Sequence, residues 1–322
     1  MESITLVGID TAKDWLDLLI NRPHSKKHRF PNDLKGIEQI KDQLGEGNYV
    51  IALEATGRYE SLARHELESA GYTVRVKNPK QVRRLAQGLG QQAKTDGLDA
   101  RFLADTAELG PDTQPRSKER ESLGDISRAI ECLKKDRSGY LKRIQVPGVN
   151  PVVITTFKAA IKDLDAHIAK LEKTFAQLMK EKDTKSLLAK RYKLALSVAG
   201  VGPVMARIAV CELPENLHAW SIRQISSYAG VAAMDNSSGK SALPAHVPRH
   251  ANSHLKGGLY MPAVSLIATQ EWAKHTYARL RATGRSHQQA IVPIMHKLLF
   301  HIVAVLKRGS PWEGEPPKGL DK

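Results

Sequence analysis

Cysteine is scarce in this chain, which has only Cys132 and Cys211 among its 322 residues. The two lie far apart in the sequence, and neither has a second cysteine nearby. A disulfide framework needs several cysteines, and a zinc knuckle needs closely spaced ones. Both kinds of scaffold are therefore excluded. We also expect no zinc at the irregularly spaced histidines that follow residue 245.

A targeting or membrane-spanning segment is also lacking. The first residues, Met1 to Ile4, show no basic region followed by the long apolar core of a secretory signal. We find no apolar run long enough to cross a bilayer. The sequence therefore predicts a cytoplasmic protein with no membrane partner.

Acidic residues are outnumbered by basic ones. The chain has 34 Asp and Glu against 49 Lys and Arg, a net charge of +15 and a pI near 9.7. Its 41% hydrophobic and 26% charged residues are typical of a soluble globular protein, and its length suggests two domains. A basic excess this large favours a nucleic-acid partner over a merely soluble basic protein.

The first hundred residues alternate short apolar runs with helix-like segments. Strands are predicted at 4–10, 15–20, 49–54 and 73–76. Helices are predicted after the capping pair Asn32-Asp33 and over about 60–70. This alternation predicts an α/β domain built on a central sheet.

Two of these strands end in an acid, Asp10 in the first and Glu54 in the third. Asp96 and Asp99 then lie three residues apart on one face of a helix that Thr95 is predicted to cap. Singly, each acid could be a turn former, a cap or part of a solvated helix start. Together they form a D-E-D-D set able to hold two divalent ions, and we expect Mg²⁺ or Mn²⁺ there.

A basic segment lies between the second and third of these acids. Lys80, Arg83 and Arg84 share one helical face, which suits the grip of a phosphate backbone. A charge run of this kind can equally be a solvated surface.

The composition shifts after Gly110-Pro111. Beyond Pro151 the apolar residues alternate in steps of three and four over four heptads, at Ile154, Phe157, Ile161, Leu164, Ile168, Leu171, Phe175 and Leu178. This spacing with charged flanks predicts a coiled-coil seam. The seam could join two helices of one chain or two chains of a dimer, and the sequence does not choose between them.

The last third of the chain contains two further motifs. The turn at Gly200-x-Gly202 resembles a helix–hairpin–helix motif, whose backbone N–H groups meet phosphates, although such turns are also common without that role. The small polar stretch 235–241 is expected to be a mobile loop. Helices should follow as far as Lys307-Arg308, and the proline-containing tail from Gly309 is expected to be disordered.

Taken together, these motifs resemble the insertion-sequence transposases with a RuvC-like D-E-D-D domain, the group described as bridge-RNA-guided recombinases. The resemblance covers essentially the whole chain in the family's order. The matching segments are Gly8-Ile9-Asp10-Thr11-Ala12-Lys13, Glu54-Ala55-Thr56-Gly57, Asn78-Pro79, Lys94-Thr95-Asp96-x-x-Asp99-Ala100-Arg101, Gly200-x-Gly202, Ser238-Gly239 and Leu259-Tyr260-Met261-Pro262-Ala263.

The resemblance implies an α/β RNase H or RuvC-like catalytic domain at 1–112 and a coiled-coil helical region at 113–190. It further implies a mainly α transposase domain at 191–308 and a disordered tail at 309–322. Catalysis is expected from Asp10, Glu54, Asp96 and Asp99 with Ser238 as nucleophile. Nucleic-acid contacts are expected at Lys80, Arg83, Arg84, Lys94, Arg101, Gly200, Gly202, Lys240, Arg249 and Lys256.

The chain departs from the family pattern after the serine. Where the family shows a basic residue, then Lys-x-Gly and an Arg, this chain has His246, Arg249-His250-Ala251 and Lys256. The charge is largely kept, while alanine replaces the glycine, a change expected to affect the geometry of the local loop.

The expected function is that of a DNA transposase or recombinase that acts on donor and target DNA as a homo-oligomer, a dimer or a tetramer. An element-encoded guide RNA is implied by the resemblance alone. One alternative is a RuvC-like junction resolvase or nuclease that activates water with the same acids. Another is a nucleic-acid-binding relative without catalysis, which the complete carboxylate set argues against.

Overall fold

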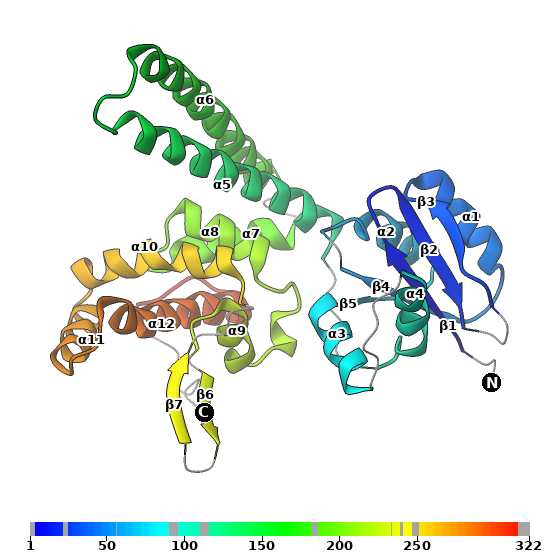
Figure 1. Ribbon diagram of the computed structural model, residues 1–322. Helices are drawn as coiled ribbons and strands as arrows, with labels where there is room; N and C mark the ends of the chain where they lie inside the picture. The colour runs from blue at the N-terminus through cyan, green and yellow to red at the C-terminus, as the bar shows by residue number, and fades with distance from the viewer. Residues whose placement is uncertain are drawn as a thin grey trace. The chain divides into compact units, whose positions relative to one another are not determined.

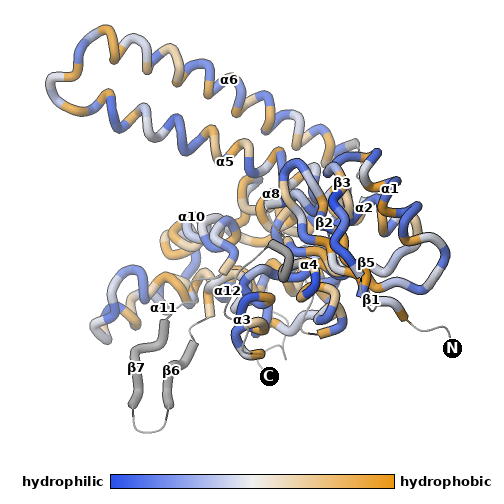
Figure 2. The backbone as a smooth tube through the Cα atoms, turned by 45° about the vertical axis from the view of Figure 1, so that its right-hand side comes forward, coloured by the Kyte–Doolittle hydropathy of each residue, from blue (hydrophilic) through white to orange (hydrophobic). Residues whose placement is uncertain are grey.

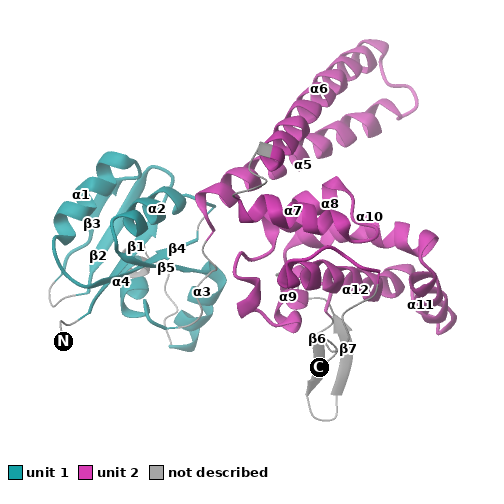
Figure 3. Cartoon of the chain, turned by 180° about the vertical axis from the view of Figure 1, so that it is seen from behind, with its two compact units in different colours: residues 1–115 teal, residues 116–322 magenta. Residues whose placement is uncertain are grey.

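The computed structural model describes residues 4–21, 25–55, 57–89, 96–109, 116–181, 186–232, 234–238, 241–246 and 251–314. Within these ranges the side chains of residues 96–99, 181, 234–238 and 241–246 are not described. The chain divides into two compact units, Met1–Pro115 and Arg116–Lys322 (Figure 3).

Unit 1 is built on a five-stranded mixed sheet (Figure 1). Its strands are β1 (Thr5–Thr11), β2 (Trp15–Ile20), β3 (His28–Pro31), β4 (Tyr49–Glu54) and β5 (Thr73–Lys77), in the order β3-β2-β1-β4-β5. The strands β1, β4 and β5 run parallel, whereas β2 and β3 are antiparallel to their neighbours. The four predicted strands are confirmed to within a residue at each end, and β3 was not predicted.

Helices cover both faces of this sheet. One face packs on α1 (Leu34–Leu44), which Asp33 caps, and on α2 (Ser61–Ser69). The other face carries α4 (Asp96–Asp105) and the half-buried Val82 of α3 (Pro79–Gly88). A Cβ at Gly8 of β1 would lie 2.0 Å from the carbonyl oxygen of Ala100. Only glycine therefore lets α4 lie directly on β1.

Unit 2 begins with two long helices, α5 (Lys118–Ile144) and α6 (Pro151–Glu181), that pack on each other (Figure 1). Every apolar position of the predicted seam in α6 is buried or half-buried. Figure 2 shows the matching alternation of apolar and polar residues along both helices. Tyr140 stacks on Phe157 with ring centroids 4.9 Å apart, and Lys134 pairs with Glu172 at 2.8 Å. Of the two arrangements that the sequence left open, the pairing within one chain is present.

The rest of unit 2 is mostly helical and has its own core. Its elements are α7 (Leu187–Ser197), α8 (Pro203–Glu212), the short 3₁₀ helix η1 (Leu217–Ala219), α9 (Ile222–Ala229), α10 (Ser253–Thr269), α11 (Glu271–Ala282) and α12 (His287–Arg308). The helix α12 buries twelve of its residues, nine of them in this apolar core. It is also long and apolar enough to cross a membrane, contrary to the sequence prediction that no run is. Because 67% of its apolar window is buried, α12 is placed as the core helix of the unit.

A two-stranded antiparallel hairpin lies between α9 and α10. Its strands are β6 (Met234–Ser238) and β7 (Ser241–His246), and the register pairs Ser238 with Ser241. The stretch predicted to be a mobile loop, 235–241, thus contains strand residues 235–238 and 241. The strand could not be predicted from these small polar residues, because strand preference rests mainly on β-branched and aromatic residues.

The C-terminal tail is ordered as far as Gly314. The backbone N–H of Trp312 donates to the Ser197 hydroxyl at 2.8 Å, and its ring lies 4.4 Å from the His301 ring. The prediction of disorder from Gly309 is therefore wrong up to Gly314. Residues 315–322 lie outside the described part of the chain.

Candidate active site

Asp10 and Glu54 lie at the carboxyl ends of neighbouring parallel strands, as predicted. The paired residues of β1 and β4 end at Ile9 and Leu53, and each acid is the next residue along its strand. The hydroxyl of the buried Thr11 donates to the backbone carbonyl of Glu54 at 3.1 Å and ties the two strand ends together. The sheet register therefore brings the two acids side by side.

The two acids share the sheet face that α4 covers. Side chains alternate along a strand, so Asp10 follows the side of Gly8 and Glu54 follows the side of Ala52. Gly8 approaches α4 at Ala100, and Ala52 lies in one apolar cluster with Leu103 of α4. The residue immediately before Ala100 is Asp99, and Asp96 is the first residue of the helix. The backbone thus brings all four acid-bearing segments to one face.

The donor set is suited to a hard divalent cation, because each of the four groups offers carboxylate oxygens. The side chains of Asp96 and Asp99 lie outside the described part of the chain. Among the described side chains, no three His, Cys, Asp or Glu residues gather closely enough to hold a metal.

A further carboxylate, which the sequence analysis missed, lies opposite Asp10. Asp17 of β2 pairs with Asp10 in the strand register and is 1% exposed. Arg29 donates from Nε and Nη2 at 2.7 and 2.9 Å, and Lys27 donates from Nζ at 3.0 Å. The hydrogen bonds from Arg29, with a smaller contribution from Lys27, hold the pKa of Asp17 below its usual range against desolvation. Asp17 therefore stays charged beside Asp10.

The basic residues predicted to bind nucleic acid are distributed over both units. Lys80, Arg83 and Arg84 are exposed on α3, and Arg101 is exposed on α4. Lys94, Lys240 and Arg249 lie outside the described residues. Lys256 is half-buried on α10 and lines a cavity. Contact of these residues with nucleic acid stays a prediction.

The two glycines of the predicted phosphate turn differ in what the fold requires of them. Gly200 has φ +82°, and a Cβ there would lie 2.8 Å from the Leu266 side chain. Gly202 caps α8 with φ −91°, and nothing lies within 4 Å of an added Cβ. Gly200 therefore has a packing reason of its own, whatever its role with nucleic acid.

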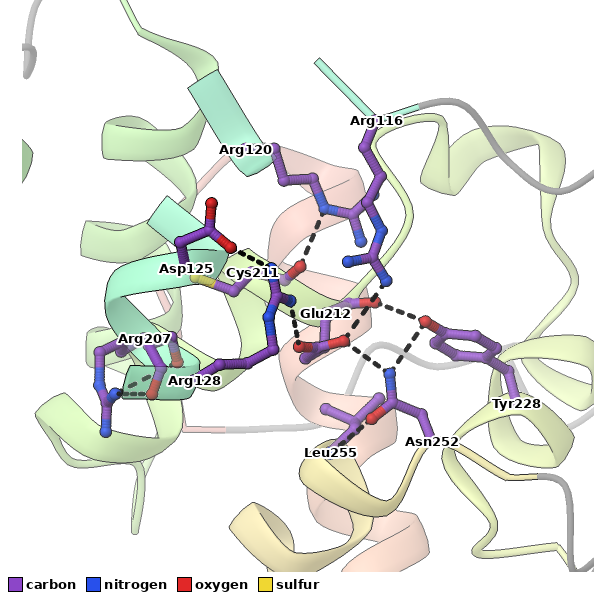
Figure 4. Close-up of polar contacts among 11 residues, drawn as sticks. Arg116, Arg120, Asp125, Arg128, Arg207, Cys211, Glu212, Tyr228, Asn252 and Leu255 are labelled. Atoms are coloured by element: carbon purple, nitrogen blue, oxygen red, sulfur yellow. Dashed lines mark hydrogen bonds and ion pairs between the residues drawn. The ribbon is translucent and has the colours of Figure 1, made fainter. Parts of the chain in front are cut away.

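Ser238, the predicted nucleophile, is the last residue of β6, and its side chain is not described. Tyr228, before the hairpin, and Asn252, after it, meet in a polar cluster around the buried Glu212 (Figure 4). Glu212, at the end of α8 and 5% exposed, accepts a hydrogen bond from Asn252 Nδ2 at 2.7 Å. Its carboxylate also pairs with Arg116 at 3.6 Å and with Arg128 at 3.7 Å.

This polar cluster joins the segments before and after the hairpin. The Tyr228 hydroxyl, from α9, donates to the backbone carbonyl of Glu212 at 3.1 Å and contacts Asn252 Nδ2 at 3.0 Å. The backbone N–H of Asn252 donates to the Tyr228 carbonyl at 2.7 Å, and its Oδ1 caps α10 by accepting from Leu255. The segments before and after the hairpin are therefore held together and fixed to α8. No sequence pattern links these three distant residues, so the cluster could not have been predicted.

Comparison with known proteins matches two parts of the chain. A family model described as a transposase, of the D-E-D-D type of IS110, matches residues 7–146. A second, described as a transposase of the IS116/IS110/IS902 family, matches residues 192–278.

Full-length relatives are also found. The chain is 26% identical over 325 residues to the pilin gene-inverting protein of Moraxella bovis, covering 97% of this chain and 98% of the relative. The protein of the same name from Moraxella lacunata matches with the same identity and coverage. An uncharacterized 43.6 kDa protein of insertion element IS110 from Streptomyces coelicolor is 28% identical over 125 residues, 39% of this chain and 31% of that protein.

Proposed function

Because the chain belongs to the IS110 family of transposases and is an enzyme that acts on DNA, we propose that it cuts and rejoins DNA strands with a serine nucleophile and an acid-held metal. The observation that carries this proposal is the placement of Asp10 and Glu54 directly after the pair Ile9 and Leu53. They lie on the face where α4, the helix of Asp96 and Asp99, contacts β1.

In this proposal the four acids hold Mg²⁺ or Mn²⁺. The bound ion would lower the pKa of a hydroxyl nucleophile and neutralise charge at the phosphate. Asp10 and Glu54 fit this role because their strand ends are fixed by the sheet and by the Thr11 hydrogen bond. The charge of the neighbouring Asp17 is already offset by its ion pairs with Lys27 and Arg29, so Asp17 is not among the proposed metal ligands.

Ser238 is the proposed nucleophile. A serine hydroxyl attacks the phosphorus as the bond to the leaving 3′-oxygen breaks, and the leaving oxygen takes up a proton. The DNA strand then remains attached to the protein until a second hydroxyl displaces the serine. Inversion, named for the Moraxella relatives, and transposition both need such cutting and rejoining.

A trapped protein–DNA adduct tests this proposal. We expect wild-type protein with Mg²⁺ to form an adduct that peptide mapping places on Ser238, and Ser238→Ala to form none. Asp10→Asn and Glu54→Gln should lose cleavage and adduct by a factor of about 10² or more while they still bind DNA, because the basic surface remains. Asp42→Asn, an exposed carboxylate on α1, is the matched control.

Two outcomes would contradict the proposal. Full recombination by Ser238→Ala would remove the serine from the reaction. Cleavage without any adduct would leave a nuclease that activates water with the acids.

We further propose a guide RNA and a homo-oligomer, both from the family resemblance. Sequencing the RNA that copurifies with the protein tests the first, and the absence of any defined RNA species would reject it. For the second, Asp10→Asn mixed with Ser238→Ala should regain activity if acids and serine come from different protomers. No recovery on mixing would place both in one protomer.

A further inference from the structure

A cavity of about 1090 Å³ lies between α10 and α12 in unit 2. Its wall includes Val231 and Ala232, the residues that lead from α9 toward β6. Ligand pockets in proteins measure roughly 300–1,000 Å³, so this one has room for a nucleotide and part of its neighbour. It lies at the base of the hairpin whose strand β6 ends at Ser238.

The lining of the cavity divides into an apolar floor and a basic rim. Ile291 and Met295 of α12 are buried apolar residues. Lys256 and Arg285 bring positive charge, and the described lining contains no carboxylate. Burial lowers the pKa of His296, so this lining residue is neutral at pH 7. Such a surface favours a partner with an apolar plane and an attached anion.

One aromatic ring in the wall is held in place by its neighbours. Tyr260 places its hydroxyl 3.0 Å from Nε2 of His287, and Nδ1 of the same ring lies 2.8 Å from the Tyr277 hydroxyl. Tyr260 is still 38% exposed. A ring whose orientation is fixed and whose surface is open provides a stacking platform with little ordering cost.

We propose that this cavity binds one unpaired nucleotide, with its base stacked on Tyr260 and its flanking phosphates at Lys256 and Arg285. A base supplies the apolar plane, and a phosphate supplies the anion. The inference rests on the family's action on DNA and does not require Ser238 to be the nucleophile. The nucleotide belongs either to a DNA strand opened near the reacting site or to an RNA, and both offer the same chemistry.

Two adjacent glycines of α10 make this proposal testable. Gly257 lines the cavity, and nothing lies within 4 Å of a Cβ added there. A longer side chain at Gly257 therefore enters open space, and it also improves helix propensity. At Gly258 an added Cβ would lie 2.8 Å from Ile208, so that position reports packing instead. Gly257→Gln should fill the site in a folded protein.

Gly257 also borders a second cavity, of about 570 Å³, which Ser265 lines as well. Ser265 does not line the first cavity among its described residues. Ser265→Gln is therefore the matched control for a side chain that projects into the neighbouring space.

The experiment uses the full chain and single-stranded oligonucleotides that carry one 2-aminopurine, in a DNA and an RNA version. We expect wild-type protein to quench the probe, and Gly257→Gln and Tyr260→Leu to lose the quenching with about tenfold weaker binding. Tyr260→Phe should keep most of the quenching because the ring remains. Lys256→Gln and Arg285→Gln should weaken binding and reduce its salt dependence, since each removes one phosphate contact.

Comparing the DNA probe with the RNA probe identifies the bound polymer. Quenching of one probe assigns the nucleotide to that polymer, and quenching of both shows that the cavity accepts either. Unchanged quenching and affinity in Gly257→Gln with both probes would overturn the proposal. Equal losses in Ser265→Gln would also overturn it. Ser238→Ala should bind and quench like wild type, so failure of the nucleophile assignment and failure of the pocket are separable.

Discussion

The acids and the serine of the proposed site are held by different means. Asp10 and Glu54 end the central strands of a sheet, where the register, the Thr11 hydrogen bond and the close contact at Gly8 fix the backbone. Ser238 ends the first strand of a two-stranded hairpin whose flanking segments are held by Glu212, Tyr228 and Asn252.

The acids on the sheet are therefore rigidly placed, whereas the hairpin that carries Ser238 can be repositioned. A sheet end moves only if the core moves, because interiors are close-packed and resist small displacements. A hairpin fixed at its base by polar contacts can be repositioned by changing those contacts while the core stays intact. Substitutions around Asp10 and Glu54 should therefore lower activity by unfolding unit 1. Substitutions at the base of the hairpin should lower activity by moving Ser238 while the core stays folded.

The largest effect is expected at Gly8. Gly8→Val places a branched side chain where even a Cβ would lie 2.0 Å from the Ala100 carbonyl. We expect a loss of about 3 kcal/mol or more in the stability of unit 1, together with cleavage activity. Gly88→Ala, where nothing lies within 4 Å of an added Cβ, is the control and should melt like wild type. A wild-type melting curve for Gly8→Val would show that α4 does not rest on β1.

Acidification should weaken unit 2 before unit 1. Burial, with a further contribution from Lys297, lowers the pKa of His301 to about 4. Between pH 6.5, the ordinary pKa of histidine, and pH 4, His301 is protonated in the unfolded chain but stays neutral in the folded chain. The stability of unit 2 should therefore fall as the pH drops through this window, by up to about 3 kcal/mol. His301→Phe should flatten this dependence in denaturant unfolding, and the same slope in both proteins would contradict the assignment.

A smaller effect is expected at Asn252. Serine at this position can still cap α10, but it loses the amide that donates to Glu212. We expect Asn252→Ser to cost about 1–2 kcal/mol and to lower the rate of adduct formation about tenfold, with DNA affinity unchanged. Asn216→Ser, at an exposed asparagine, is the control. An unchanged rate with reduced stability would limit the polar cluster to a structural role.

The smallest effect is expected at Asp17. Its pKa is lowered, so its bonds to Arg29 and Lys27 stabilise unit 1 above the ordinary carboxyl pKa near 3.8 and are lost as the pH falls below it. Asp17→Asn should reduce this acid-induced loss without changing the slope at neutral pH. Hydrogen exchange of β2 below pH 4 would measure it, and equal protection in both proteins would contradict the prediction.

Much of unit 1 could be predicted because its strands are continuous apolar runs. The runs that became β1 and β4 end in the two acids, and parallel pairing places them together. The strand β3 was missed because His28-Arg29-Phe30-Pro31 is half polar and ends in proline. Asp17 looked like the polar position of an amphipathic strand. Its pairing with Asp10 could have been found by counting outward from the short turn between the two strands.

Unit 2 was less predictable because its determining contacts join distant residues. Glu212 and Asn252 are 40 positions apart and meet only after α8 and α10 pack together. The strand β6 has small polar residues in place of β-branched ones, so its pattern resembles a loop. The order at Trp312 depends on His301 and Ser197, which no local pattern connects to the tail.

The contact between Gly8 and Ala100 has a consequence for the newly made protein. The first strand leaves the ribosome long before its helical partner, since 92 positions separate the two residues. Synthesis proceeds at about 5–20 residues per second, so α4 is made several seconds after the strands that carry Asp10 and Glu54. During that interval the nascent chain has only part of its proposed metal ligands and no serine. With the acids and Ser238 in their proposed roles, the nascent chain would be unable to cut nearby nucleic acid until most of its length has been translated.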